Sequence, residues 1–305
     1  MTRLVLLLTF SLLLAGCTGK PPQPRRAPVP IPVLGASAHT QAPNTRCDEQ
    51  GRIYSVRDGM ELVRVRGGTV QLGDPGGRYD EQPQFMAQLD DFLMDATEVT
   101  NAQFEHFVAT AGHEAEGPWR RGFGDGQSNW PVRFVTWFDA QAYARWAGRA
   151  LPTEAQWEAA CGTARYPWGD TWQAGRAITD LEPGSGPASA VSSTDRSPFG
   201  VLNLGGNVRE WCADWYDRYA YADHAARSPT RNPAGPIDDA SPRSDFVAAG
   251  AVAGNERSTR RVVRGGSWTG QGQEVSRSAR RGAHNPTQWL DDVGFRCVQP
   301  LEGRP

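Results

Sequence analysis

The chain has little of what several common classes of site require. Only five histidines occur among its 305 residues, and no two of them are four residues apart, as a helical metal-binding pair would be. A non-haem iron centre, which uses two histidines and a carboxylate, is therefore not indicated. The formal net charge of -2 also lacks the basic excess of a nucleic-acid-binding surface, so we expect no nucleic-acid partner.

Regular periodicity is scarce as well. Apolar residues rarely recur at helical or strand spacing, whereas the chain contains 11 tryptophans, 34 glycines and 23 prolines. This composition predicts one domain in which aromatic anchors hold irregular loops, with few long helices or strands. The roughly 250 residues that follow the N-terminal segment suffice for a single core.

The only long apolar run lies at the N-terminus and is too short to span a membrane. Residues 1–16 predict a signal peptide, and Leu-Ala-Gly before Cys17 resembles the bacterial lipobox, in which the cysteine is lipidated. An ordinary signal peptide with an incidental cysteine is the alternative. We expect a proline-rich tether over 17–50 and a domain over 51–305. Thr18 resembles an outer-membrane sorting signal, so the predicted location is the bacterial outer membrane.

Short strands are predicted in the first part of the domain. Residues 61–65 and 69–72 alternate between apolar and polar side chains around Gly67 and Gly68, which predicts a hairpin. Residues 91–95 form a further candidate strand.

Three helices are expected after these strands. Thr100 and Gln103 have the spacing of a capping box, a second helix is expected over 137–149, and a third should run from Thr153 to near Gly162. No long helix is apparent beyond them. Short helices among many short strands indicate an α+β domain.

Several sequence blocks occur in an order that is typical of one family. They are Glu-Val-Thr-Asn at 98–101, Trp-Phe-Asp-Ala at 137–140, Leu-Pro-Thr-Glu-Ala-Gln-Trp-Glu at 151–158, Tyr-Pro-Trp-Gly at 166–169, Asn-Leu-Gly-Gly-Asn-Val-Arg-Glu-Trp at 203–211, Arg-Gly-Gly-Ser-Trp at 264–268 and Gly-Phe-Arg-Cys at 294–297. Over about residues 59–300 the chain resembles the formylglycine-generating, or sulfatase-modifying-factor, family. The resemblance implies an elaborated C-type-lectin-like fold with little regular secondary structure.

Members of that family oxidise a sulfatase cysteine with a cysteine pair of their own, which lies between the Gly-Gly-Ser and Gly-Phe-Arg blocks. Residues 269–293 of this chain contain no cysteine, and Gly270 and Gln273 stand at the approximate counterparts. We therefore expect no copper, assign no catalytic residue, and do not expect a copper-dependent formylglycine-generating oxidase.

The resemblance also implies a calcium site. Its ligands would be the side chains of Asn203 and Glu210 and the backbone carbonyls of Gly206 and Val208, a set of oxygens that suits a hard cation. The alternative is a turn in which Glu210 accepts backbone amides without metal. A second family calcium site is expected to be absent or remodelled, because Ile178 stands where an asparagine would be needed.

Four residues match or adjoin the family's active groove. Ser267 and Arg281 match positions that line it, Arg209 replaces a large apolar residue of catalytic members, and His284 lies nearby in sequence. Ser267 has no evident base beside it, so no hydrolase triad can be assembled. Each of the five histidines is expected to be an exposed loop residue. Trp211 and Trp268 are expected in the core.

Four cysteines remain after Cys17, and in an exported protein an even number suggests disulfides. Cys47, Cys161, Cys212 and Cys297 allow three connectivities. Family pairings do not transfer, because the counterpart positions are Ser278 and Ala144. We predict Cys161–Cys212 and Cys47–Cys297, with free buried thiols as the alternative.

These observations favour a membrane-anchored lipoprotein whose domain is a non-catalytic binding or structural module of the cell envelope. Its partner would be an envelope protein, a peptide or a glycan. The alternative is an oxidoreductase of the wider family that does not use the cysteine pair, since the resemblance includes cysteine-less members that act in pyoverdine maturation.

Overall fold

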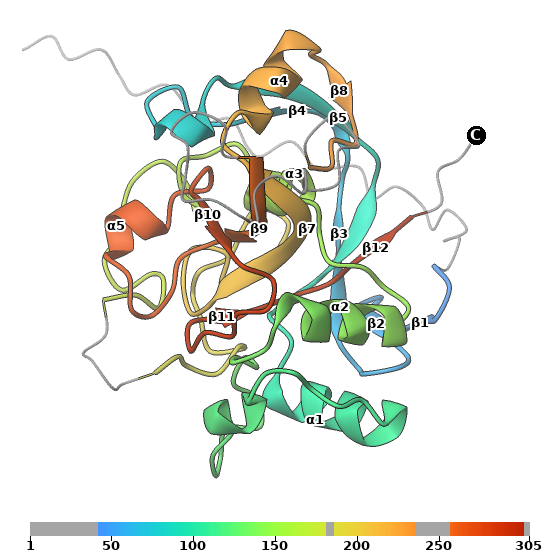
Figure 1. Cartoon of the computed structure of the whole chain (residues 1–305). Coiled ribbons are helices and arrows are strands. Elements are labelled where there is room, and N and C mark those ends of the chain that lie inside the picture. The colour runs from blue at the N-terminus through green and yellow to red at the C-terminus, as the bar shows by residue number, and fades with distance from the viewer. Residues whose placement is uncertain (1–41, 181–185, 236–256, 302–305) are drawn as a thin grey trace, which may run out of the picture. The chain divides into compact units, whose positions relative to one another are not determined.

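The computed structural model describes residues 42–180, 186–235 and 257–301, all within one compact unit of the chain, 41–305 (Figure 1). The expected signal peptide, Cys17 and most of the tether lie outside the described residues. Within the described ranges no helix combines the length and apolarity needed to cross a membrane.

Helices in this unit are few and short, as expected. They are α1 (Asn101–Ala111), α2 (Trp137–Trp146), α3 (Glu154–Cys161), α4 (Ala220–Ala226), α5 (Gly272–Val275) and the 3-10 turns η1 (Tyr79–Glu81) and η2 (Trp119–Gly122). Capping boxes start the first three, at Thr100, Thr136 and Thr153. A threonine oxygen accepts the backbone N–H three residues later at each start, which satisfies a donor that the helix itself cannot.

Three small sheets make up the rest. The five-stranded sheet has the order β1 (Thr45–Cys47), β2 (Ile53–Ser55), β3 (Glu61–Val65), β6 (Phe92–Asp95) and β12 (Val298–Pro300). The four-stranded sheet has the order β10 (Arg281–His284), β9 (Arg257–Arg264), β7 (Arg209–Asp217) and β11 (Val293–Gly294). The three-stranded sheet contains β4 (Gly68–Leu72), β5 (Phe85–Leu89) and β8 (Thr230–Arg231). Since β1 starts at Thr45, the predicted tether of 17–50 overlaps the first sheet.

The hairpin predicted around Gly67 and Gly68 does not form. Strand β3 pairs with β2 and β6, whereas β4 pairs with β5, so the two segments belong to different sheets. The chain bends where the Gly67 amide donates to Asp91 Oδ1 at 2.8 Å, and a Cβ on Gly67 would lie 2.3 Å from the Leu89 carbonyl oxygen. The alternation instead marks two consecutive strands, β3 and β4, that pair in different sheets.

The hydrophobic core of the described residues consists of three clusters, each of which contains buried aromatic side chains. One packs α1 and α2 around Phe104 and Tyr143, and the second surrounds Trp157 under α3. The third joins Phe85 and Tyr221 beneath α4, which lies beside β4, β5 and β8 in Figure 1. The expected burial of Trp211 and Trp268 is confirmed.

Neither predicted disulfide is present, because all four described cysteines are free thiols. Cys47 is exposed on β1, whereas Cys297 is buried in the cluster of α1 and α2. Cys161 and Cys212 lie in the same cluster, but their sulfurs lie against backbone carbonyl oxygens, of Trp157 at 3.7 Å and of Glu210 at 3.9 Å. Burial raises the pKa of the Cys161, Cys212 and Cys297 thiols well above the usual value, which keeps them protonated and unreactive.

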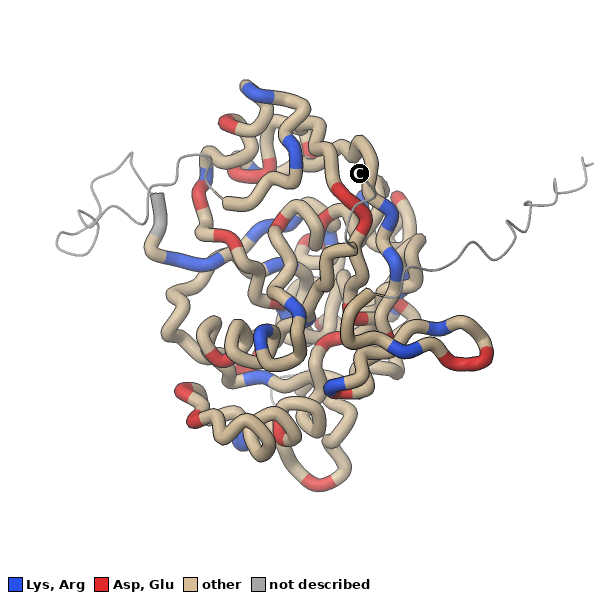
Figure 2. The backbone as a smooth tube through the Cα atoms, turned by 90° about the vertical axis from the view of Figure 1, so that its right-hand side faces the viewer, with Lys and Arg blue, Asp and Glu red and all other residues tan. Residues whose placement is uncertain are grey.

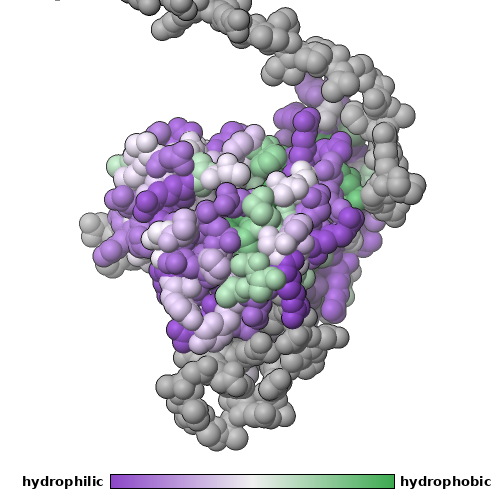
Figure 3. All heavy atoms as spheres, turned by 90° about the horizontal axis from the view of Figure 1, so that it is seen from above, coloured by the Kyte–Doolittle hydropathy of each residue, from purple (hydrophilic) through white to green (hydrophobic). Residues whose placement is uncertain are grey.

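The described surface carries mixed charge and only scattered apolar residues. Acidic and basic positions are interspersed over the view in Figure 2. The face seen in Figure 3 is mostly hydrophilic, with a small hydrophobic area near its centre. The exposed large hydrophobic residues among those described are Val56, Tyr79, Phe138, Val191 and Trp289.

Candidate binding groove

A cavity of about 280 Å³ lies where the four-stranded sheet meets the segment after β9. Three of the four predicted groove residues line it, namely Arg209 at the start of β7, Ser267 after β9, and Arg281 at the start of β10. Asp292 and Thr269 line it as well. The structure therefore brings together residues that lie up to 83 positions apart, as expected for the groove of the fold.

Arg209 is the centre of the polar wall, and its charge is already paired. Its Nε and Nη2 donate to the two oxygens of Asp292 at 3.0 and 2.7 Å, and its Nη1 lies 2.6 Å from His284 Nε2. Burial, together with the Arg209 charge, lowers the pKa of His284 to about 4, so the imidazole is neutral and its Nε2 accepts. The polar wall thus consists of a two-point ion pair between Arg209 and Asp292, and the same guanidinium also contacts a neutral histidine.

Ser267 contacts no histidine base. Its hydroxyl lies 3.1 Å from Asp292 Oδ2 and 3.0 Å from Thr269 Oγ1, and the Thr269 hydroxyl is itself 3.4 Å from the same carboxylate. In this geometry the acceptor beside the Ser267 hydroxyl is the Asp292 carboxylate.

Arg281 differs from the expectation, because its guanidinium is not available to the groove. Its Nε and Nη2 each donate to Glu154 at 2.7 Å, and its Nη1 donates to the carbonyls of Asp80 and Asp217. The side chain is 0% exposed. Arg281 therefore anchors β10 to the start of α3, a role that requires the distant Glu154 and was not visible in the sequence.

The histidines also depart from expectation, since only some are exposed. His106 is exposed on α1, whereas His113 is half-buried with Nε2 2.9 Å from Asp139 Oδ1, and His224 is buried on α4. His284 ends β10 and is half-buried. Each of the three partly or fully buried rings packs on an aromatic side chain from another element or turn, which loop composition alone did not indicate.

The two positions expected at the counterparts of the cysteine pair differ in their surroundings. Gly270 lines the cavity, but Gln273 is exposed and does not. Val275 lines the cavity instead, and a Cβ on Gly270 would lie 2.8 Å from its side chain. An apolar valine thus fills the space against Gly270, which leaves no thiol and little room for one.

The predicted calcium ligands lie beside a buried arginine. Arg296 donates from Nε to Glu210 Oε2 at 2.6 Å and from Nη2 to Oε1 at 2.7 Å, while the Trp157 indole N–H donates to Oε2 at 2.8 Å. Three donors occupy three of the roughly four lone-pair sites of a carboxylate. One acceptor site on Oε1 remains for a cation, so Glu210 alone fits a metal poorly.

The neighbouring residues fit a cation better. Asn203, at φ +65, donates from Nδ2 to Glu98 Oε2 at 2.6 Å and to the Ala190 carbonyl at 2.7 Å, which leaves its buried Oδ1 without a partner. Asp195 accepts from the Gly205 amide at 2.5 Å, but its other buried oxygen also has no partner. Burial raises the pKa of Glu98 to about 8 and that of Asp195 to about 7.

Among the described residues, no group of three or more His, Cys, Asp or Glu side chains is placed to hold a metal ion. The predicted ligand set has a single such side chain, Glu210, with one amide and two carbonyls, so it would not form a group of that kind. Buried oxygens without a hydrogen-bond partner lie next to buried carboxylates that outnumber the guanidinium groups around them. This is the observation that supports a cation here.

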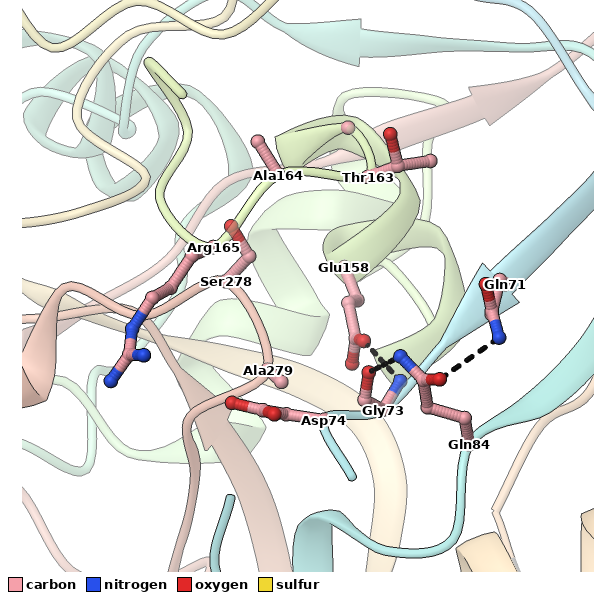
Figure 4. A pocket seen from close by; sticks show the side chains of 11 residues that line it. Gln71, Gly73, Asp74, Gln84, Glu158, Thr163, Ala164, Arg165, Ser278 and Ala279 are labelled. Carbon is pink, nitrogen blue, oxygen red and sulfur yellow. Dashed lines mark hydrogen bonds between the residues drawn. The ribbon is translucent and has the colours of Figure 1, made fainter. Parts of the chain in front are cut away.

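A further cavity, of about 200 Å³, lies between β4 and the end of α3 (Figure 4). Its main acid, Glu158, accepts from the Gly73 amide at 2.7 Å, from the Tyr221 hydroxyl at 2.6 Å and from Arg264 at 2.7 Å. Gln84 bridges the Gly73 carbonyl and Gln71. These polar groups are hydrogen-bonded to protein groups, so the cavity offers a ligand few free donors or acceptors.

Sequence reasoning missed several residues of these sites. Asp292 and Thr269 complete the groove, and Glu98 and Asp195 surround Asn203. Glu98 belongs to a block that carried the family resemblance, so a search of those blocks for acids would have found it. Asp292 stands in an irregular segment, and no local pattern identifies it.

Comparisons with known proteins bear on the whole unit. The family profile of the sulfatase-modifying factor enzyme 1-like domain matches residues 53–301. The chain is 33% identical to the formylglycine-generating enzyme of Streptomyces coelicolor, over 83% of this chain and 94% of that enzyme. It is 32% identical to the serine/threonine-protein kinase pkn1 of Chlamydia pneumoniae over 79% of this chain, but it spans only 38% of the kinase. The solved structure of PvdO from Pseudomonas aeruginosa matches with a TM-score of 0.63 at 20% identity, over 86% of this chain and 99% of PvdO.

Proposed function

Because this chain belongs to the sulfatase-modifying factor enzyme 1-like family, we propose that it uses the family's fold as a non-catalytic binding module of the cell envelope. The observation that carries the proposal is the state of the groove. Arg209, Asp292 and Ser267 are paired with one another, and Val275 packs against Gly270 in an interval without cysteine. Such a surface can hold a partner by hydrogen bonds but has no activated nucleophile or thiol.

The partner would be an envelope protein, a peptide or a glycan that inserts one small group. A cavity of about 280 Å³ is near the lower end of ligand sites, which suits a side chain or a single sugar rather than a large cofactor. The hydroxyls of Ser267 and Thr269 would donate or accept hydrogen bonds along one wall, and the paired Arg209 would donate from its remaining N–H groups.

Site-specific crosslinking tests this role. A photoreactive amino acid is placed at Thr269 in the groove and, as matched control, at the exposed Thr110 on α1. In cells that make the full chain, we expect a discrete adduct with one envelope component from position 269 only. Equal adducts from both positions, or none from either, would contradict a binding groove.

The competing function is an oxidoreductase that works without the cysteine pair. The purified chain is incubated with copper, oxygen and a Cys-x-Pro-x-Arg peptide, and aldehyde is measured by mass spectrometry. We expect no aldehyde, because the groove lacks the two thiols that would hold copper. Repeated turnover, or a redox metal that copurifies in stoichiometric amount, would favour the enzyme.

We propose further that Cys17 carries the lipid anchor, on the strength of the Leu-Ala-Gly-Cys segment and the proline-rich stretch after it. Two or more acyl chains hold a protein on a membrane far more firmly than one. In Cys17→Ser the chain should be released from membranes or accumulate as an unprocessed precursor. Wild-type processing and membrane fractionation of the variant would reject the anchor.

Calcium at Asn203, Gly206, Val208 and Glu210 is also a proposal. The unpartnered oxygens of Asn203 and Asp195 support it, and Arg296 on Glu210 argues for a site in which Asn203 and the carbonyls carry more of the binding. When bound, the cation would neutralise buried acids and fix the turn at 203–210, which precedes the groove residue Arg209.

A further inference from the structure

A row of aromatic and arginine side chains begins on the η2 turn. The guanidinium carbon of Arg121 lies 5.2 Å from the centroid of the Trp289 ring. The centroid of the Phe134 ring lies 6.3 Å from that of Trp289, and the guanidinium carbon of Arg133 lies 5.4 Å from the Phe134 ring. We call these four residues the Trp289 row. None of them lines the groove.

Backbone contacts hold together the two segments that carry most of this row. The Phe134 amide donates to the Leu290 carbonyl at 2.9 Å, and the Trp137 amide donates to the Pro286 carbonyl at 3.0 Å. Phe134 has φ +57, which lies in the left-handed region that bulky side chains seldom adopt. Such a conformation persists only where the surrounding structure enforces it. The place of the Phe134 ring beside Trp289 is therefore set by the folded chain.

Aromatic surface stays open to solvent along the row. The Trp289 side chain is 40% exposed, and Phe138, which begins the second turn of contact with the same segment, is 42% exposed. Tryptophan, phenylalanine and arginine are enriched in protein–protein interfaces, and tryptophan and arginine dominate the binding energy of many. Aromatic rings that adjoin one another on the surface favour a docking surface over incidental exposure.

The two arginines of the row form no salt bridge with a carboxylate among the described residues. Arg133 donates from Nη1 to the Asp291 carbonyl at 3.4 Å, while its Nε is buried without a hydrogen-bond partner. Burial lowers the pKa of Arg133, and the charge of Asp291 offsets only part of that effect. A buried donor without an acceptor is unfavourable, so this end of the row lacks an anionic partner.

The turn that precedes Trp289 favours a carboxylate-bearing peptide over a glycan. Asn285 Oδ1 accepts from the Thr287 amide at 3.0 Å and from its hydroxyl at 2.8 Å, and Gln288 Oε1 accepts from the Asn285 amide at 3.1 Å. Sugar hydroxyls need acceptors as well as donors, and these side-chain acceptors are engaged within the turn. Arginine offers donors only, which is what a carboxylate requires.

We propose that the Trp289 row docks an acidic segment of a protein partner. Aspartate or glutamate side chains of that segment pair with Arg121 and Arg133, and an apolar side chain between them packs on Trp289. Guanidinium and carboxylate groups form charge-assisted hydrogen bonds, and the aromatic rings exclude water beside them. This surface lies outside the groove and does not depend on the proposed role of the groove.

Fluorescence anisotropy with the detergent-solubilised full chain tests the docking. The probe is a labelled pool of short peptides randomised among Asp, Glu, Leu and Phe, and a second pool has Lys and Arg in place of the acids. We expect saturable binding of the acidic pool only. Trp289→Ala should weaken it by about tenfold or more, as truncation of an interface tryptophan typically does. Arg121→Gln, at an exposed side chain that a folded variant tolerates, should weaken it in the same direction.

The matched control is Arg231→Gln, which removes the same charge from an exposed salt bridge with Asp90. Its strand, β8, lies beside α4 and away from α1 in Figure 1, and binding should stay unchanged. Labelled oligogalacturonate represents an anionic glycan, and tighter binding of it than of the acidic pool would overturn the peptide partner. Equal binding of the two peptide pools, no binding of either, or equal loss in Arg231→Gln and Arg121→Gln would overturn the docking surface.

Discussion

Two buried ionic centres of this domain differ in their charge balance. In the first, Arg264 and Arg281 pair with Glu154 and Glu158, so two positive charges meet two negative ones. In the second, Arg296 pairs with Glu210, and Glu98 and Asp195 are buried nearby. There only Glu210 is bonded to the guanidinium, and the charge of Arg296 acts on Glu98 and Asp195 from nearby.

The pKa shifts follow that balance. Burial alone would raise the pKa of Glu154, but Arg281 and Arg264 together hold it below its usual value. In the second centre burial prevails over the effect of Arg296, and it raises the pKa of Glu98 to about 8. The first centre is complete as the chain folds, whereas the second needs protons or a bound cation to compensate its charge.

The largest expected effect comes from breaking the balanced centre. Glu154→Gln removes the carboxylate that two buried guanidinium groups share, and an uncompensated buried charge typically costs about 3–5 kcal/mol of unfolding free energy. Urea denaturation of the full chain measures it. A loss within experimental error of zero would mean that the two arginines find other partners.

Calcium should have the next largest effect, and only through the unbalanced centre. At a hundred times its Kd, a ligand of the folded state adds about 2.7 kcal/mol to the unfolding free energy. Asn203→Gly removes the orphaned oxygen and suits the left-handed backbone at φ +65, so most of the calcium increment should vanish. Identical melting curves of the wild-type chain with calcium and with chelator would reject the site.

The pH dependence of the unfolding free energy, measured in the presence of chelator, tests the same difference between the two centres. The raised pKa of Glu98 means that its folded form binds a proton more tightly than its unfolded form. Its stabilising contribution is complete below about pH 4.5 and is lost as the pH rises to about 8, by up to about 1.4 kcal/mol per pH unit. Urea midpoints between pH 5 and pH 8 should fall, and Glu98→Gln should flatten that slope. Calcium should flatten it too, so an unchanged slope would count against both.

The smallest effect is expected for an exposed ion pair. Glu105→Gln breaks the contact with Arg120, where the side chains are 47% and 66% exposed. Solvent screens such a pair, so the loss should stay below about 1 kcal/mol in the same urea experiment. It serves as the control for Glu154→Gln, and a comparable loss in both variants would remove the distinction between buried and exposed pairs.

Much of the local structure could be predicted from the sequence because its causes are local. Thr100 and Thr153 each stand three residues before a glutamine, and both start helices as predicted. The strand at 91–95 is confirmed by β6. The hairpin at 61–72 was wrong because strand partners depend on where the chain bends, and Asp91, which holds that bend, is 24 positions from Gly67.

The sites were predicted less well, for a related reason. Ser267 and Arg209 do line one cavity, because the sequence blocks that carry the resemblance meet there. Arg281 lines it too, but its guanidinium is hydrogen-bonded to Glu154, which lies 127 positions away in the sequence. Partial burial and the charge of Arg209 lower the pKa of His284 to about 4, which keeps its imidazole neutral over a wider pH range.

By itself the sequence determined the family, the starts of α1, α2 and α3, and the absence of cysteine from 269–293, because each is a property of residue identity and short-range spacing. Tertiary structure alone decided which charges are paired, since an arginine's role depends on the carboxylate that folding brings to it. Arg281 pairs with a buried glutamate inside the fold, and Arg296 pairs with one of the buried carboxylates around it. Arg280 has a buried N–H donor, Nε, without an acceptor. In a low-dielectric interior these pairings set the energies, and they are made between residues far apart in the chain.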